Sequence, residues 1–118
     1  MSDQPTTAYK VLTGDQMATL ERDASFPGAP IDLADGYIHL STADQLTETV
    51  DKHFAGQRDL HVAAVDLEAL GNAVKWEASR GGALFPHLYG GPLLLETVIA
   101  YGPLERGADG TVKLPVSG

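Results

Sequence analysis

The sequence predicts one small α+β domain with a mixed or split β-sheet and two main helices. The expected elements run strand, helix, strand, helix and then three strands with little helix between them, which is typical of α+β domains. No G-x-G-x-x-G segment follows the first expected strand, so a Rossmann fold is not expected. A length of 118 residues with 43% apolar content suits a single domain over 1–118, with a core at about 8–104 and a hairpin or tail at 105–118.

The first strand and helix are predicted from residue type and capping. Strand-forming residues fill positions 8–12. Thr13 and Gln16 have the spacing of a capping box, which predicts a helix that begins there and reaches about Ser25. Two prolines and a glycine in the segment 26–30 end this helix, because proline cannot continue it.

The segment 36–41 predicts a strand with two unlike faces. Successive side chains of a strand point to opposite faces, so Tyr37, His39 and Ser41 share one face and two aliphatic residues share the other. We expect the aliphatic face to pack on the core and the polar face to line a site.

A second capping box, at Thr42 and Gln45, predicts a helix that ends near Gly56. The apolar run 60–67 predicts a buried central strand, and alternation over 73–77 predicts another strand.

The last third of the chain is expected to begin with a long loop. Residues 80–92 carry four glycines and two prolines, and loops of this length in small domains are often functional. Residues 93–101 predict one final apolar strand. The turn at 108–111, followed by 112–114, predicts a marginal hairpin or tail.

Composition excludes several classes of function. The chain has no cysteine, which rules out disulfides, thiolate metal sites and cysteine nucleophiles. A formal net charge of -8 argues against non-specific binding of long nucleic acids, which depends on many basic contacts. No apolar run approaches the roughly 20 residues that span a bilayer, so we expect no membrane partner and a cytoplasmic protein.

His39 is the strongest candidate for chemistry. It lies on the polar strand face directly before the helix start at Thr42, where free N–H groups offer an anion site. The alternative is a core histidine bonded to a backbone carbonyl. A metal site built from His39, His61, His87 and Glu77 is a further alternative, but their spacing gives it no support and no metal is expected.

The glycine-rich loop and the strand before it supply a second group of candidates. His87 and Tyr89 alternate beside glycines that allow close approach of a ligand, and Lys75 and Arg80 add positive charge for a phosphorylated ligand. Glu77 is the candidate carboxylate for orienting a hydroxyl or stabilising a developing cation. The alternatives are a rigid surface loop and a solvated strand-edge glutamate.

Three segments carry a resemblance to a known family. They are Gly-Tyr-Ile-His-Leu-Ser-Thr at 36–42, Lys-Trp-Glu at 75–77 and Leu-Phe-Pro-His-Leu-Tyr-Gly at 84–90. From about Tyr9 to Leu104 the chain resembles the bacterial family known as domain of unknown function 952, to which no activity is assigned. Members of this family look like compact relatives of the ADP-ribosyltransferase fold, a split α/β sheet whose cleft holds a dinucleotide.

The resemblance implies roles for particular residues. His39-Leu40-Ser41 is similar to a His-x-Ser or His-x-Thr motif of that larger group, also seen in transferases that remove a 2′-phosphate from spliced transfer RNA with NAD. Lys10 lies on the first strand, where the group usually places His or Arg on the dinucleotide. The late-strand glutamate of many ADP-ribosyltransferases has no assured match in Glu77 or Glu96.

The leading hypothesis is therefore an enzyme, ADP-ribosyltransferase-like or NAD-dependent phosphotransferase-like, acting on NAD, ADP-ribose or another small phosphorylated nucleotide. His39 and Glu77 would be catalytic. The residues expected to hold the nucleotide are Lys10, Ser41, Thr42, Arg80, His87 and Tyr89. Because some of the 8 basic residues fall beside these histidines, we expect a small positive cleft. The alternatives are a non-catalytic module that binds a nucleotide or a partner, and a metal-dependent hydrolase.

Overall fold

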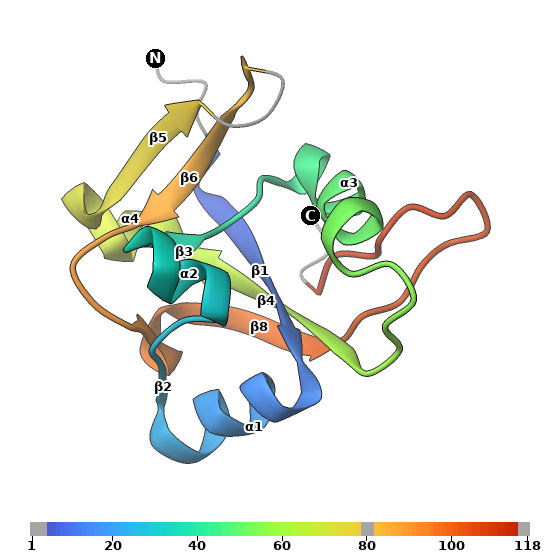
Figure 1. Ribbon diagram of the computed structural model, residues 1–118, viewed down its shortest axis with the longest axis horizontal. Helices are drawn as coiled ribbons and strands as arrows, with labels where there is room; N and C mark the ends of the chain where they lie inside the picture. Colours follow the sequence, from blue (N-terminus) through green and yellow to red (C-terminus); the bar gives the residue numbers. More distant parts are fainter. Residues whose placement is uncertain (1–4, 79–81, 116–118) are drawn as a thin grey trace.

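Three antiparallel sheets organise the residues that the computed structural model describes, which are 5–78 and 82–115 (Figure 1). The strands are β1 (Thr7–Thr13), β2 (Ser25–Phe26), β3 (Ile38–His39), β4 (Leu60–Asp66), β5 (Val74–Ala78), β6 (Leu84–Leu88), β7 (Leu93–Leu94) and β8 (Val98–Pro103). The first sheet has the order β1-β4-β8, the second has the order β3-β6-β5, and the third pairs β2 with β7. Among the described strands every pair is antiparallel, so the strands form several antiparallel sheets and not one mixed sheet.

Helices of very different length connect these strands. They are α1 (Gly14–Asp23), α2 (Pro30–Asp35), α3 (Ala43–His53) and α4 (Leu67–Leu70), with 3-10 turns η1 (Gly71–Ala73) and η3 (Leu95–Thr97). Both predicted capping boxes are confirmed, because the Thr13 and Thr42 hydroxyls accept from the N–H groups of Gln16 and Gln45, whose side chains bond back. None of the helices in the described ranges is long and apolar enough to cross a membrane.

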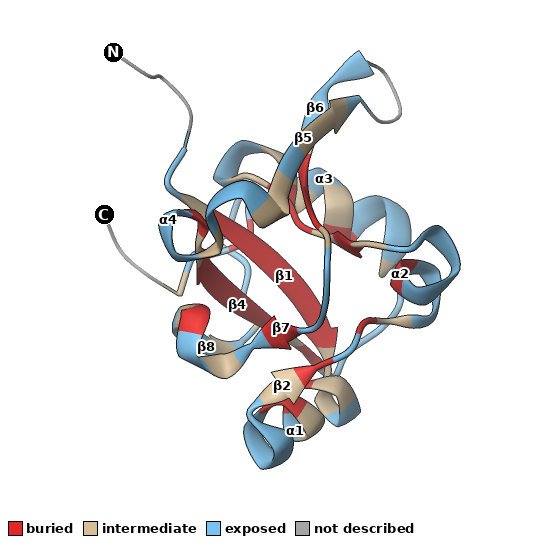
Figure 2. Cartoon of the chain, turned by 90° about the vertical axis from the view of Figure 1, so that its left-hand side faces the viewer, coloured by how far each residue is buried: buried red, intermediate tan, exposed pale blue. Residues whose placement is uncertain are grey.

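The core lies on both faces of the first sheet. β1 sends alternate side chains to two apolar clusters, with Leu12 in one and Val11 in the other. Leu20 of α1 belongs to the first cluster and Leu46 of α3 belongs to the second. Figure 2 shows β1 and β4 almost entirely in the colour of buried residues. The small α+β domain predicted from the sequence is therefore confirmed at this level.

The predicted loop at 80–92 is wrong for its middle part, since Leu84–Leu88 forms the central strand β6 of the second sheet. Pro86 misled the prediction, because a proline cannot donate to a strand ladder. The carbonyl of Pro86 accepts from the N–H of Leu40, so Pro86 turns its backbone polar groups toward β3, just beyond the end of that strand. The missing N–H therefore also lies on the β3 side, beyond the end of that strand, and Pro86 keeps its place opposite Trp76 of β5.

Other predicted boundaries differ for similar local reasons. The strand expected at 36–41 is only two residues long, although Ser41 forms an isolated bridge with Tyr9. The strand expected at 93–101 is interrupted by η3, where the Thr97 hydroxyl donates to the carbonyl of Leu94 at 2.6 Å. This interruption lets β7 pair with β2 and β8 pair with β4. The short helix α2 was not predicted.

Candidate functional site

The register of the second sheet collects the predicted candidates on one face. His39 of β3 lies opposite His87 of β6, and His87 lies opposite Lys75 of β5. The neighbouring row, Ile38, Leu88 and Val74, packs against the first apolar cluster. Because alternate residues of a strand share a face, Glu77 and Tyr89 join the histidine side. We call this side, with Tyr37, the histidine face.

Tyr37 lies at the centre of a group of rings on the histidine face. Its ring stacks on His87 with centroids 4.2 Å apart, and it lies 4.6 Å from His39 and 5.1 Å from Tyr89. The two imidazole rings meet edge to face at 5.3 Å. Contacts of this kind restrict ring rotation, so the two histidines hold defined orientations.

The His39 ring lies between two carboxylates of α2. Nδ1 is 2.6 Å from Oδ1 of Asp32, and Nε2 is 3.0 Å from Oδ2 of Asp35. Asp32 is almost fully buried, with 1% of its side chain exposed, whereas Asp35 is 44% exposed. Burial alone would raise the pKa of Asp32, but hydrogen bonds from His39 and Lys10 and the charge of Lys10 hold it well below its ordinary value. An ionised Asp32 only accepts, so Nδ1 of His39 carries the proton between them.

Lys10 lies behind His39 rather than on the exposed face. Its Nζ is 2.9 Å from Oδ2 of Asp32 and donates to the backbone carbonyl of His39 at 3.1 Å. Only 7% of the side chain is exposed. Burial lowers the pKa of Lys10, and Asp32 opposes this shift. The charge that was expected to hold a phosphate is therefore used inside the protein.

A second carboxylate holds the other imidazole. Nδ1 of His87 is 2.8 Å from Oε1 of Glu77, and the Tyr89 hydroxyl donates to the same oxygen at 2.7 Å. The hydrogen bond from Tyr89, followed by that from His87, keeps the pKa of Glu77 below its ordinary value, and the same bond raises the pKa of Tyr89 to about 12. Glu77 is therefore a carboxylate at neutral pH, and neither contact uses its Oε2.

Other predicted residues have structural partners. The Ser41 hydroxyl is buried and lies 2.8 Å from the hydroxyl of Thr49, and the Thr42 hydroxyl caps α3. Lys75 places Nζ 5.3 Å from the centre of the Tyr89 ring, within reach of a cation–π interaction. Arg80 lies outside the described residues. Within 5–78 and 82–115, no group of three or more His, Asp or Glu is arranged to hold a metal ion.

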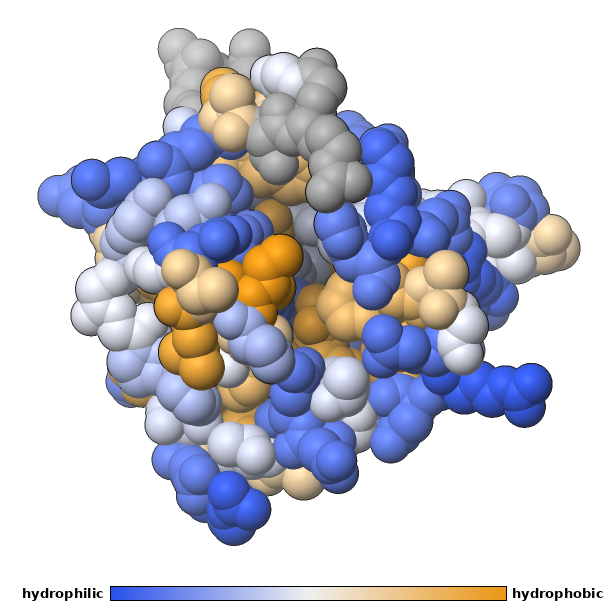
Figure 3. All heavy atoms as spheres, viewed as in Figure 1, coloured by the Kyte–Doolittle hydropathy of each residue, from blue (hydrophilic) through white to orange (hydrophobic). Residues whose placement is uncertain are grey.

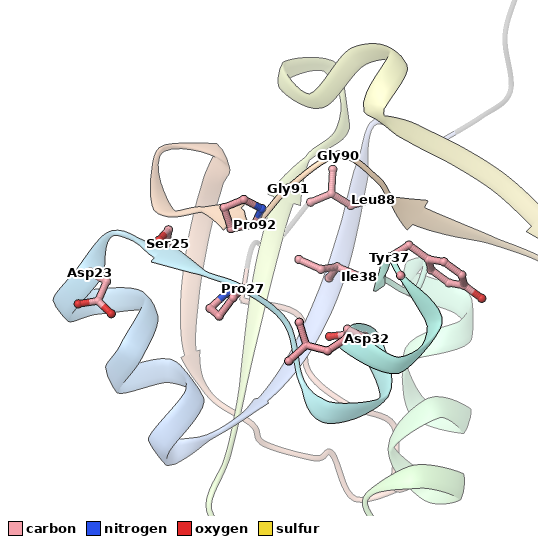
Figure 4. A pocket seen from close by; sticks show the side chains of 12 residues that line it. Asp23, Ser25, Pro27, Asp32, Tyr37, Ile38, Leu88, Gly90, Gly91 and Pro92 are labelled. Atoms are coloured by element: carbon pink, nitrogen blue, oxygen red, sulfur yellow. The ribbon is translucent and has the colours of Figure 1, made fainter.

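A groove of about 530 Å³ adjoins this face. In Figure 4 the side chains of Ile38, Leu88 and Pro27 lie around the groove, whereas the ring of Tyr37 extends away from it. A second hollow of about 520 Å³ shares the Gly90-Gly91-Pro92 segment. Figure 3 shows a hollow near the centre of its face, where hydrophobic and hydrophilic residues meet. Both grooves have space for part of a small ligand beside the histidine face.

The residues that sequence reasoning missed are Asp32 and Asp35. Both belong to α2, and this helix has recognisable end signals: Pro30 at its first position and Gly36 after its last, where φ is +86°. Asp32 acts as a capping residue because its Oδ2 accepts from the N–H of Ala29 at 2.8 Å. Its contacts with Lys10 and His39 are tertiary, and no local pattern could have indicated them.

The fold and the site together define a small α+β protein with two carboxylate-held histidines on one sheet face. The chain belongs to the family described as Protein of unknown function (DUF952), whose model matches residues 11–101. The family predicted by resemblance is thereby confirmed. A search of curated proteins found no match.

Solved structures of a Caulobacter crescentus protein, CC0527, are similar to this chain. The crystal structure is 46% identical with a TM-score of 0.82, and the match covers 92% of this chain and 94% of that chain. The solution NMR structure is 47% identical with a TM-score of 0.77 and covers 92% and 91% of the two chains. Likeness at this level extends to almost the whole fold.

Proposed function

We propose that the histidine face binds NAD or a related ADP-ribose-containing nucleotide and supports transfer or hydrolysis at the ribose carbon. The supporting observation is that each imidazole donates from Nδ1 to an ionised carboxylate, so Nε2 is the ring nitrogen left for chemistry, and in the more exposed His39 it faces Asp35. The split sheet is also consistent with the ADP-ribosyltransferase likeness that the family resemblance implies.

In the proposed reaction the bond between nicotinamide and the ribose C1′ breaks first, and its electron pair leaves with the nicotinamide. Positive charge then develops on the ribose. The Glu77 carboxylate is 40% exposed and can accept a hydrogen bond from the 2′-hydroxyl through Oε2, which stabilises this charge. An acceptor hydroxyl, from water in the hydrolytic case, attacks C1′ and gives its proton to Nε2 of His39. The products of hydrolysis are ADP-ribose, nicotinamide and a proton.

Binding would use the rings of the histidine face and the charge at its edge. Tyr37 and Tyr89 offer π-surfaces for a base or pyridine ring, and Lys75 supplies an ammonium group for a phosphate. Asp35 must leave Nε2 of His39 before an acceptor can approach it. Ser41 and Thr42 have no part in this arrangement, because their hydroxyls already serve the α3 segment.

Thermal-shift measurements with NAD, ADP-ribose and 2′-phosphorylated nucleotides test the binding step. A ligand at a hundred times its dissociation constant adds about 2.7 kcal/mol of stability, which raises the melting temperature by several degrees. Nicotinamide release, followed by chromatography, tests the reaction. His39→Gln and Glu77→Gln should abolish release. The matched control is His61→Gln, because His61 belongs to β4 in the first sheet, where its Nε2 lies 3.5 Å from Asp59, and it is not part of the histidine face. No shift with any nucleotide would refute the proposal.

A non-catalytic binding module is the second candidate. The observation that favours it is that the reactive groups already pair with one another. The ring nitrogens of His39 contact Asp32 and Asp35, and Nδ1 of His87 contacts Glu77. A protein that is stabilised by NAD but releases no nicotinamide in the presence of water or phosphate would support this candidate over the enzyme.

A further inference from the structure

The buried pair of Lys10 and Asp32 contacts three groups of His39: its backbone N–H, its backbone carbonyl and its ring Nδ1. Asp32 Oδ1 accepts from the backbone N–H of His39 at 3.1 Å and lies 2.6 Å from its Nδ1. Lys10 Nζ donates to the backbone carbonyl of the same residue. The peptide and the ring of His39 are thus both fixed by one ion pair that comes from β1 and α2.

Stability alone is a weak explanation for a buried ion pair in this place. Replacing a buried ion pair with apolar side chains of similar volume is often neutral or stabilising, so such a pair is weak evidence for a stabilising role. The Lys10–Asp32 pair lies directly behind the most exposed member of the histidine pair, since His39 is 30% exposed and His87 only 4%. Its contacts converge on the one imidazole that a ligand can reach most easily.

We propose that Asp32 is a positioning residue that holds His39 as the Nδ1–H tautomer and so leaves the electron pair of Nε2 for the ligand once Asp35 has moved away. Lys10 keeps the Asp32 carboxylate in place and charged. This inference rests on the proposed function for its purpose, because a general base at His39 needs a free electron pair on Nε2. The tautomer itself is a property of the protein without ligand.

The substitution Asp32→Asn should reverse the tautomer. The Oδ2 position accepts from the Lys10 ammonium group and from the N–H of Ala29, so the amide oxygen of an asparagine would take that position. The backbone N–H of His39, which bonds to Oδ1 in the wild type, would lose its acceptor. The NH₂ group of the asparagine would then point at Nδ1 of His39, which must accept. The ring proton would move to Nε2, where the Asp35 carboxylate can accept it at a spacing of 3.0 Å.

Long-range ¹H–¹⁵N NMR of the imidazole rings tests this inference, because it distinguishes a protonated ring nitrogen from an unprotonated one. His39 is assigned by the loss of its signals in His39→Gln. Spectra are recorded about two pH units above the ordinary histidine pKa of about 6.5. Asp35→Asn is the matched control, since it makes the same chemical change at the other ring nitrogen.

We expect the proton on Nδ1 in the wild type and in Asp35→Asn, and on Nε2 in most molecules of Asp32→Asn. If Asp32→Asn does not fold, the double variant Lys10→Met with Asp32→Asn removes both buried charges, and the N–H of Ala29 is then the donor that holds the amide oxygen at the Oδ2 position in the same measurement. Retention of the Nδ1 proton in the folded variant, or its absence in the wild type, would overturn the inference. The measurement uses no ligand, so it can fail while nicotinamide release succeeds, or the reverse.

Discussion

Asp32→Asn should destabilise the protein strongly, and Lys10→Met in the same chain should restore part of the loss. The carboxylate and the ammonium group are 2.9 Å apart, and their side chains are 1% and 7% exposed. Removing one partner of such a pair leaves a buried charge without compensation, which costs about 3–5 kcal/mol. Removing both partners leaves no buried charge, so the double variant should be at least about 2 kcal/mol more stable than Asp32→Asn alone.

Urea unfolding measures this difference. Trp76 is the single tryptophan and belongs to β5, so its fluorescence reports on the second sheet. Lys10→Met, Asp32→Asn and the double variant can be compared in this way when the wild type lies in the upper part of the ordinary range of about 5–15 kcal/mol and the slope of the transition is unchanged. An Asp32→Asn loss below about 1 kcal/mol, or a double variant as unstable as the sum of the two single variants, would refute the reasoning.

The same variant should change the response to acid. The pKa of Asp32 is lowered in the folded state, so its contribution to the free energy of unfolding is complete above the unfolded-state value of about 3.9. That contribution is lost as the pH falls through the lower folded value. The wild type should therefore lose stability below about pH 4 more steeply than Asp32→Asn. If the free energy of unfolding of the two proteins falls in parallel as the pH is lowered, the pKa of Asp32 is not lowered in the folded state and the reasoning is wrong.

Three further substitutions give separate checks. Asp35→Asn removes a negative charge beside Nε2 of His39, so calorimetry should show severalfold tighter binding of ADP-ribose; unchanged affinity would contradict the role given to Asp35. Tyr89→Phe removes the shorter of the two hydrogen bonds to Glu77, so ¹³C NMR should show the pKa of that carboxyl rising toward its ordinary value rather than staying fixed. Thr42→Ala removes the side-chain cap of α3 and should cost about 1 kcal/mol in urea unfolding, and a loss near zero would be inconsistent with the cap.

Local signals predicted much of the fold. Both capping boxes are short-range patterns, and the structure has both, at Thr13 and Thr42. The strand β6 was not predicted because a proline favours a loop. Only the structure shows that the backbone carbonyl of Pro86 points toward the β3 side. Sequence patterns report intrinsic preference, and this strand depends on which neighbour faces the missing N–H.

The candidate site was predictable as a set of residues but not as a geometry. Alternation placed His39 and Glu77 on polar strand faces and His87 was expected in a loop, and the register of β3 with β6 brought the two histidines opposite each other. Asp32 had no such signal, because its contacts with Lys10 join residues more than 20 positions apart. The expectation for Lys10 came from its place on the first strand in the family resemblance, and only the fold reveals that its charge faces inward.

The distribution of charge now constrains how a nucleotide would lie on this face under the proposed function. The acidic balance of the chain extends into the site, where Asp35 and Glu77 flank the histidines and Lys10 is already neutralised by Asp32. A phosphate near His39 would therefore be repelled by the carboxylates of Asp35 and Glu77. Among the described residues of the histidine face, Lys75 on the edge strand β5 carries the positive charge that can still attract a phosphate. The phosphates should accordingly lie toward β5, and the uncharged ribose and its ring should lie toward His39, where partly exposed carboxylates favour developing positive charge.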